Sequence, residues 1–115
     1  MINIKQKLSI MVENVREELT HAYEGNLEDE YGELVSLWEY LTQSLSVDFR
    51  IDSKLNILGV RVWFCLGGPN IWIDTETKTI EGHWGITKAT LFINKELVDA
   101  INDEFKNRTY WGMSQ

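Results

Sequence analysis

Residues 66–85 read LGGPNIWIDTETKTIEGHWG, and this stretch decides the fold. It contains the one proline of the chain, four of the eight glycines and two of the five tryptophans. The sequence GGPN at 67–70 ends the preceding apolar run, and IWI at 71–73 favours an extended backbone. Polar residues at 74–78 form a turn before the chain returns through 79–84. The stretch therefore predicts a tight turn followed by a β-hairpin, with Lys78 at a position that often needs a positive φ.

The hydrophobic period changes on either side of this hairpin. Apolar residues from Ile4 to Tyr23 recur every three or four positions, which predicts a helix that ends at Gly25. The same spacing over 31–45 predicts a second helix that begins near Leu27. Alternation at 47–51, the apolar run at 57–66 and the alternation at 86–93 predict three further strands. Asn94 is the expected N-cap of a last helix that ends near residue 108.

The order of these elements predicts one α+β domain over residues 1–115. We expect two N-terminal helices, a mainly antiparallel meander of four to five strands and one C-terminal helix. A chain of 115 residues is long enough to form a single hydrophobic core. The helices should cover one face of the sheet and leave the other partly solvated. We expect the tail at 109–115 to be ordered only if Tyr110 and Trp111 pack against the domain.

The charge is negative and unevenly distributed. The formal net charge is −7, which disfavours direct binding to nucleic acid or to an anionic membrane. Residues 1–39 hold nine acidic residues against three basic ones, so nearly all of the excess lies in the N-terminal third. Such a surface can imitate a phosphate backbone and enter a basic groove of another protein, or it can simply keep the protein soluble. The candidate contact residues are Glu17, Glu18, Glu24, Glu28, Asp29, Glu30 and Glu33.

Cysteine usage and hydropathy indicate a compartment. One cysteine, Cys65, cannot form an internal disulfide, and so nothing indicates an oxidising environment. The N-terminus lacks an apolar segment of signal-peptide length, and no window approaches the roughly 18 apolar residues of a membrane span. We expect a cytoplasmic protein, in the host cytoplasm if a phage encodes it.

The sequence favours no catalytic or cofactor site. Cys65 lies in an apolar strand without a basic neighbour, which is typical of an inert buried thiol. Glu17 and His21 have the spacing of two metal ligands on a helix, but no further ligands are visible, which favours an ion pair. The GGPN turn lacks a following lysine and leads into a strand, and so it matches no phosphate-binding motif. We therefore expect no enzyme, no metal and no cofactor.

The aromatic residues form the last constellation: Trp63, Trp72, Trp84 and Trp111, with His83 and Tyr110. Strand alternation places Trp72 opposite its isoleucine neighbours and Trp84 opposite His83. If the isoleucines face the core, Trp72 either anchors a partner or belongs to a second small core closed by the C-terminal tail. Trp72, Trp84 and His83 are therefore added to the candidate contact residues.

The sequence GGPNIWIDTETKTIEGHWG followed by INKELVDAINDEFKN resembles small acidic proteins encoded by phages and integrative elements of Gram-positive bacteria. These share the GGPN turn, an aromatic-rich hairpin, a Trp-Gly end and a closing helix, and the likeness spans about residues 60–107. Lys78 departs from the pattern, because glycine is common there. Some proteins of this general kind are anti-CRISPR or other anti-defence inhibitors. The resemblance implies a non-enzymatic inhibitor whose partner is a host CRISPR nuclease or another defence complex.

Two other functions remain open. An immunity or antitoxin protein that neutralises one cognate toxin would have the same composition, and a neighbouring toxin gene would distinguish it. A small-molecule-binding protein or small enzyme would use His83 and Glu81, which share a strand face and could transfer a proton. A homodimer is expected if the open sheet face or an edge strand is apolar.

Overall fold

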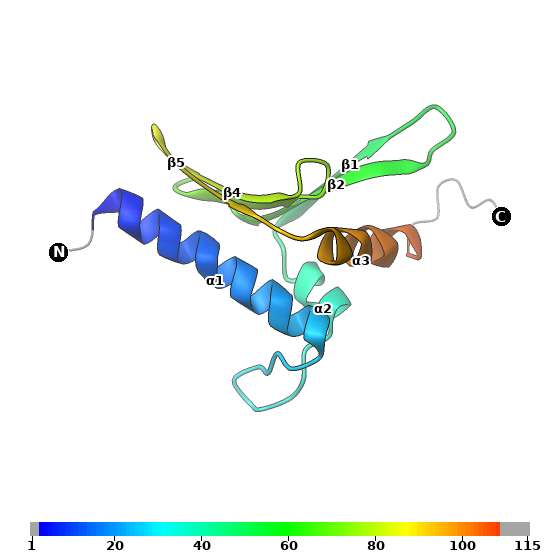
Figure 1. The fold of residues 1–115 in the computed structure, drawn as a ribbon, viewed down its shortest axis with the longest axis horizontal. Coiled ribbons are helices and arrows are strands. Elements are labelled where there is room, and N and C mark those ends of the chain that lie inside the picture. Colours follow the sequence, from blue (N-terminus) through cyan, green and yellow to red (C-terminus); the bar gives the residue numbers. More distant parts are fainter. Residues whose placement is uncertain (1–2, 109–115) are drawn as a thin grey trace.

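The computed structural model describes residues 3–108 and confirms the α+β class. All helices lie on one side of a five-stranded sheet (Figure 1). The elements are α1 (Ile4–Glu24), α2 (Leu37–Thr42), β1 (Ser46–Ile51), β2 (Ile57–Cys65), β3 (Asn70–Asp74), β4 (Thr79–Trp84), β5 (Thr87–Phe92) and α3 (Lys95–Lys106). Tyr110 and Trp111 lie outside the described residues, and so does the predicted packing of the tail.

The sheet is the predicted antiparallel meander, with strand order β1-β2-β3-β4-β5. The hairpin that dominates the sequence is β3–β4, in which Asp74 pairs with Thr79 across a four-residue turn. Lys78 has φ 60°, which confirms that it occupies a position suited to glycine. Its carbonyl accepts a hydrogen bond from the backbone N–H of Ile93 at 2.9 Å, and so the strained turn also holds the chain after β5.

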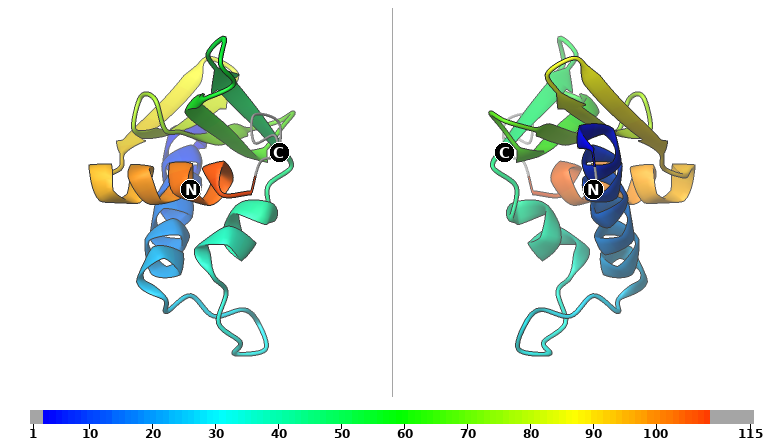
Figure 2. Two further views of the ribbon diagram at one scale, coloured as in Figure 1. Left: turned by 90° about the vertical axis from the view of Figure 1, so that its right-hand side faces the viewer. Right: turned by 90° about the vertical axis from the view of Figure 1, so that its left-hand side faces the viewer.

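The core lies between the sheet and the helices. Val62, Ile73 and Ile80 are in register across β2, β3 and β4, and all three are fully buried. α1 lies against β4 and β5 and inserts Leu8 and Val12 over this face. Strand alternation then directs every second residue of each strand to the opposite face, which no helix of residues 3–108 covers (Figure 2).

The ends of α1 follow from local sequence signals. Asn3 and Gln6 form a capping box at its N-terminus, and Gly25 ends it with φ 82° in the left-handed region. α3 begins as predicted, because the side chain of Asn94 accepts a hydrogen bond from the N–H of Leu97 at 2.9 Å. The ring of Phe105 near its end contacts Trp38 and Phe49, which joins α3 to both α2 and the sheet.

The prediction of two N-terminal helices is wrong over the first half of the second one. Residues 25–36 form a loop, here called the acidic loop, that projects away from the sheet (Figures 1 and 2). The side chain of Asp29 accepts hydrogen bonds from the N–H groups of Tyr31 at 2.8 Å and Glu33 at 3.0 Å. Gly32 completes the turn with φ 80°. These side-chain bonds replace the helical ones, because aspartate competes with the helix for backbone donors.

The second helix therefore begins ten residues later than predicted, at Leu37. The Ser36 hydroxyl accepts from the N–H of Glu39 at 3.1 Å, and the Glu39 carboxylate accepts from the N–H of Ser36 at 3.0 Å. This capping box fixes the start of α2, and the apolar spacing that suggested a longer helix belongs partly to the acidic loop. Four predicted contact residues, Glu28, Asp29, Glu30 and Glu33, thus lie on a loop.

Candidate functional site

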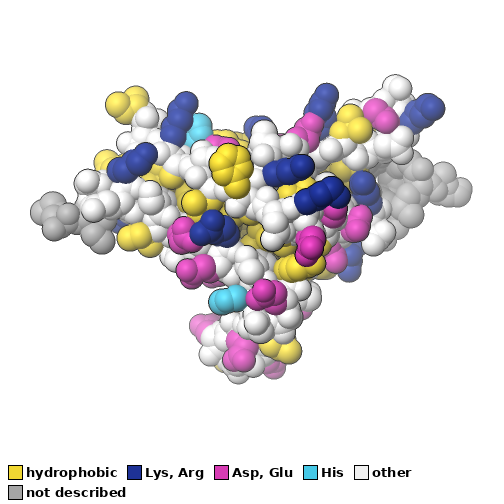
Figure 3. All heavy atoms as spheres, viewed as in Figure 1, with side chains coloured by type: hydrophobic (Ala, Val, Ile, Leu, Met, Phe, Trp, Pro, Cys, Tyr) yellow, Lys and Arg dark blue, Asp and Glu magenta, His cyan; other side chains and the backbone are white. Residues whose placement is uncertain are grey.

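The structure brings the seven predicted acidic residues together at one end of the molecule. We call this surface the acidic pole: Glu17, Glu18 and Glu24 of α1 with Glu28, Asp29, Glu30 and Glu33 of the acidic loop. All seven are exposed. In the view of Figure 3, acidic side chains and a histidine surround the lower lobe of the molecule, whereas lysine and arginine lie mixed with acidic side chains over the upper part. Negative charge is therefore concentrated at one end of the molecule, which the formal net charge alone does not reveal.

The negative charge of the acidic pole is not neutralised internally. Within residues 3–108, none of its seven carboxylates forms an ion pair. Glu13, one turn before the pole, does pair with Arg16. Of the seven residues, Glu24 lies in the last turn of α1, where the helix dipole is negative and an acidic side chain is unfavourable. His21 is the one basic residue in the last turn of α1. The position of Glu24 and the mutual repulsion of the seven carboxylates therefore oppose folding stability.

Two of the seven carboxylates also accept hydrogen bonds from within the protein. Asp29 holds the acidic loop together, and Glu18 accepts a hydrogen bond from the hydroxyl of Tyr40 at 3.1 Å. Among the described residues, five carboxylates of the acidic pole have no hydrogen-bond partner: those of Glu17, Glu24, Glu28, Glu30 and Glu33. These five side chains are available to a partner without the loss of an internal contact.

Tyr40 lies beneath the acidic pole and is only 3% exposed. It borders a hollow of about 280 Å³ between α1, α2 and the acidic loop. Burial raises the pKa of Tyr40 far above its ordinary value of 10.0, and the charge of Glu18 and the hydrogen bond to it raise it further. The hydroxyl therefore keeps its proton in the folded protein.

We expect the free energy of unfolding to fall as the pH rises above about 10. The unfolded chain releases the Tyr40 proton near 10.0, whereas the folded chain retains it, so alkaline pH favours unfolding. The decrease attributable to this group should approach about 1.4 kcal/mol per pH unit. Urea denaturation at several alkaline pH values would measure it. The free energy of unfolding of the Tyr40→Phe variant should depend less steeply on pH, because the variant lacks this hydroxyl. Lysines and other groups titrate equally in both proteins, and so they cancel in the comparison. Identical slopes would contradict the assignment.

A second group of predicted residues lies on the open face of the sheet. The ring of Trp72 lies 4.7 Å, between centroids, from both Trp63 of β2 and His83 of β4. We call Trp63, Trp72 and His83 the aromatic row. All three are half-buried. The row confirms the predicted orientation of Trp72 away from Ile71 and Ile73, which are buried. Trp63 belonged to the predicted aromatic constellation but not to the predicted contact residues, because the apolar run at 57–66 does not show which face of the strand it lies on.

Trp84 is separated from the other two predicted aromatic residues. It lies on the helix-facing side of β4, where it packs against the core and the ammonium of Lys7 lies 5.9 Å from its ring centroid. Of these three predicted contact residues, Trp72 and His83 therefore lie on the open face of the sheet, whereas Trp84 lies beneath α1. One protein surface cannot contact all three side chains together.

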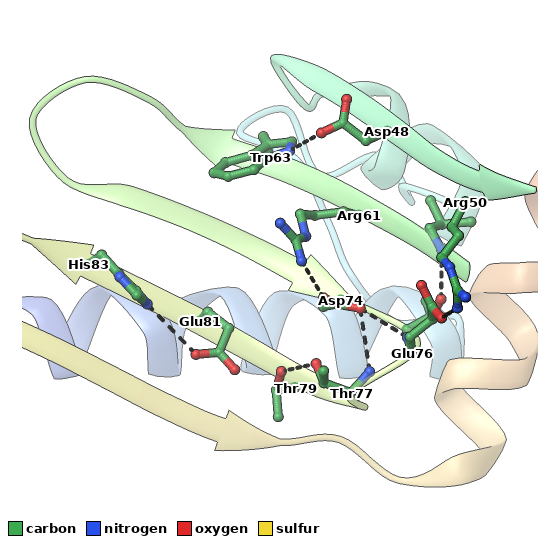
Figure 4. A network of polar contacts seen from close by, with 12 residues as sticks. Asp48, Arg50, Arg61, Trp63, Asp74, Glu76, Thr77, Thr79, Glu81 and His83 are labelled. Carbon is green, nitrogen blue, oxygen red and sulfur yellow. Dashed lines mark hydrogen bonds and ion pairs between the residues drawn. The ribbon is translucent and has the colours of Figure 1, made fainter. Parts of the chain in front are cut away.

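His83 and Glu81 share the open face, as alternation predicted (Figure 4). His83 Nε2 lies 3.9 Å from Glu81 Oε1, and the hydroxyl of Thr90 donates to the same oxygen at 3.0 Å. The pair thus forms part of a polar network that runs across neighbouring strands. Glu81 and Thr90 are directly opposite one another in the β4–β5 ladder.

Over residues 3–108, no group of three or more His, Cys, Asp or Glu side chains is placed to hold a metal ion. Glu17 and His21 gain no third ligand there. In the same range, no helix has the length and apolar character to cross a membrane. Comparison of the chain with protein-family models, curated proteins and solved structures finds no match. The likeness to mobile-element proteins therefore stays a prediction.

Proposed function

We propose that this protein is a non-enzymatic inhibitor of a host nucleic-acid-processing defence complex, such as a CRISPR nuclease. Its acidic pole would occupy a basic channel that otherwise holds nucleic acid. The observation that supports the proposal is the cluster of exposed carboxylates that lack ion-pair partners in the described chain. Lysine and arginine side chains that normally hold phosphates can bind such carboxylates instead.

The location of the acidic pole adds to this argument. Negative charge at the C-terminal end of a helix costs stability, and mutual repulsion among the carboxylates costs more. Functional surfaces often carry such a cost, because residues selected for binding are not those that best stabilise the free protein. The acidic loop is also ordered internally by Asp29, which lowers the entropy lost on binding. Binding should weaken as the salt concentration rises.

The test is inhibition of target-DNA cleavage by a panel of CRISPR nucleases and restriction complexes. We expect the wild-type protein to inhibit at least one of them. The triple variant Glu28→Lys, Glu30→Lys, Glu33→Lys should inhibit at least tenfold more weakly, because three attractive contacts become repulsive. None of these three side chains has an internal partner among the described residues, and so the fold should persist.

A matched control separates local contact from net charge. The variant Glu96→Lys, Asp99→Lys, Asp103→Lys changes the net charge by the same amount on the exposed side of α3. Because Asp99 pairs with Lys95 at 2.8 Å and Glu96 lies in the first turn of the helix, circular dichroism must first show that this variant is folded. It should inhibit like the wild type. Equal losses in both triple variants would show that net charge alone matters. Full inhibition by the acidic-loop variant would overturn the proposed imitation of nucleic acid.

A further inference from the structure

A hollow of about 180 Å³ opens on the uncovered face of the sheet, beside the aromatic row. Its lining comes from β1, β2, β3 and the turn after β3: Asp48, Phe49, Arg50, Gly59, Val60, Arg61, Asp74 and Glu76. Gly59 leaves space at the floor, since a Cβ there would lie 2.2 Å from Cγ of Glu76. The side chain of Glu76 therefore lies across Gly59, and the depression depends on the absence of a side chain at that position.

The charges that line the hollow do not cancel. Arg50 pairs with Glu76, and Arg61 pairs with Asp74 at 2.9 Å (Figure 4). Asp48 is the remaining carboxylate; it lies opposite Arg61 in the β1–β2 ladder but forms no ion pair within residues 3–108. Its Oδ2 accepts a hydrogen bond from Nε1 of Trp63 at 2.9 Å. The hollow therefore carries one uncompensated negative charge next to an indole ring, which favours a cationic occupant.

Arg61, which lines the hollow, already lies against the aromatic row. The Arg61 guanidinium carbon lies 5.9 Å from the ring centroid of Trp63 and 5.6 Å from that of Trp72, within the range of cation–π attraction. Asp74, which is 6% exposed, holds Arg61 in this position. Asp48 holds Trp63 in the same way. The site is thus organised before any partner arrives, which lowers the entropy lost on binding.

We infer that this hollow and the neighbouring ring of Trp63 form a second docking site, which takes one arginine or lysine side chain of the basic partner. The partner's basic character rests on the proposed function, whereas the affinity for a cation rests on the site itself. The cation would pair with Asp48 and lie beside Trp63, whose Nε1 donates to the same carboxylate.

The test is a titration of the whole protein with N-acetyl-arginine amide, followed through the indole N–H signals in ¹⁵N NMR spectra. N-acetyl-citrulline amide has nearly the same shape without the charge and is the matched ligand control. We expect saturable shifts at Trp63 and Trp72 with the arginine compound and at least fivefold weaker binding of the citrulline compound. The Asp48→Asn variant should bind the arginine compound about fivefold more weakly, because one ion pair is lost. Asparagine can still accept the Trp63 hydrogen bond, and so the ring should stay in place.

The variant Asp103→Asn removes the same charge from α3 and should bind arginine like the wild type. Equal responses to arginine and citrulline, or no response to either, would overturn the inference. Adenosine monophosphate is the third ligand. If adenosine monophosphate binds more tightly than the arginine compound, and the Asp48→Asn substitution does not change its affinity, the aromatic row binds nucleobases by stacking and the inference is wrong. No effector takes part, and so the result is independent of the cleavage test of the acidic pole.

Discussion

The variant Gly82→Ala is expected to lower the free energy of unfolding by about 3 kcal/mol. Gly82 lies on β4 directly beneath α1. A Cβ at this position would lie 2.6 Å from Cγ2 of Val12 and 2.9 Å from Cδ1 of Leu8, both of which are fully buried. Neither side chain can move outward, because each packs in the centre of the core. The helix must therefore shift away from the sheet, and urea denaturation followed by circular dichroism would measure the cost.

Gly68→Ala is the matched control for this variant. Gly68 lies in the turn before β3, a Cβ there meets nothing within 4 Å, and the residue does not have a positive φ. The substitution should be neutral or slightly stabilising, since alanine reduces the entropy of the unfolded chain. If the two alanine variants were equally stable, the close packing of α1 on β4 would be incorrect.

The variant Asp74→Ala is expected to destabilise the protein by about 2–4 kcal/mol. Asp74 lies at the end of β3 and is almost fully buried. One carboxylate oxygen accepts from Arg61 at 2.9 Å, and the other accepts from the N–H groups of Glu76 at 3.0 Å and Thr77 at 3.4 Å. Removal of the carboxylate leaves these donors unpaired at the turn of the β3–β4 hairpin. Thermal and urea denaturation would report the loss.

A second aspartate provides the comparison. Asp52 also accepts from two backbone N–H groups in a turn, those of Lys54 at 2.8 Å and Asn56 at 2.9 Å, but it is partly exposed and pairs with no arginine. Water can replace its bonds, and so Asp52→Ala should cost about 1 kcal/mol or less. A cost for Asp74→Ala no larger than this would show that burial and the Arg61 pair add nothing.

Local signals explain which elements the sequence predicted correctly. Asn3, Gly25 and Asn94 act on backbone groups within a few residues of themselves, and so their effect does not depend on the rest of the fold. The β3–β4 hairpin is equally local, including the positive φ of Lys78. The prediction that the second helix begins near Leu27 was wrong, because the apolar spacing at 31–45 does not account for the hydrogen bonds that Asp29 accepts and the turn at Gly32.

For the candidate sites, the sequence alone determined the excess of acidic residues in the first third of the chain, the hairpin and the outward direction of Trp72. These follow from composition and from the two-residue period of a strand. Only the tertiary structure decided that the carboxylates meet at one pole, that Trp63 lies beside Trp72, and that Asp48 lies opposite Arg61 without an ion pair among residues 3–108. The physical reason is that charge and direction are local properties. Which side chains of adjacent strands become neighbours depends on the strand register, and the register is fixed only when all elements pack around the core.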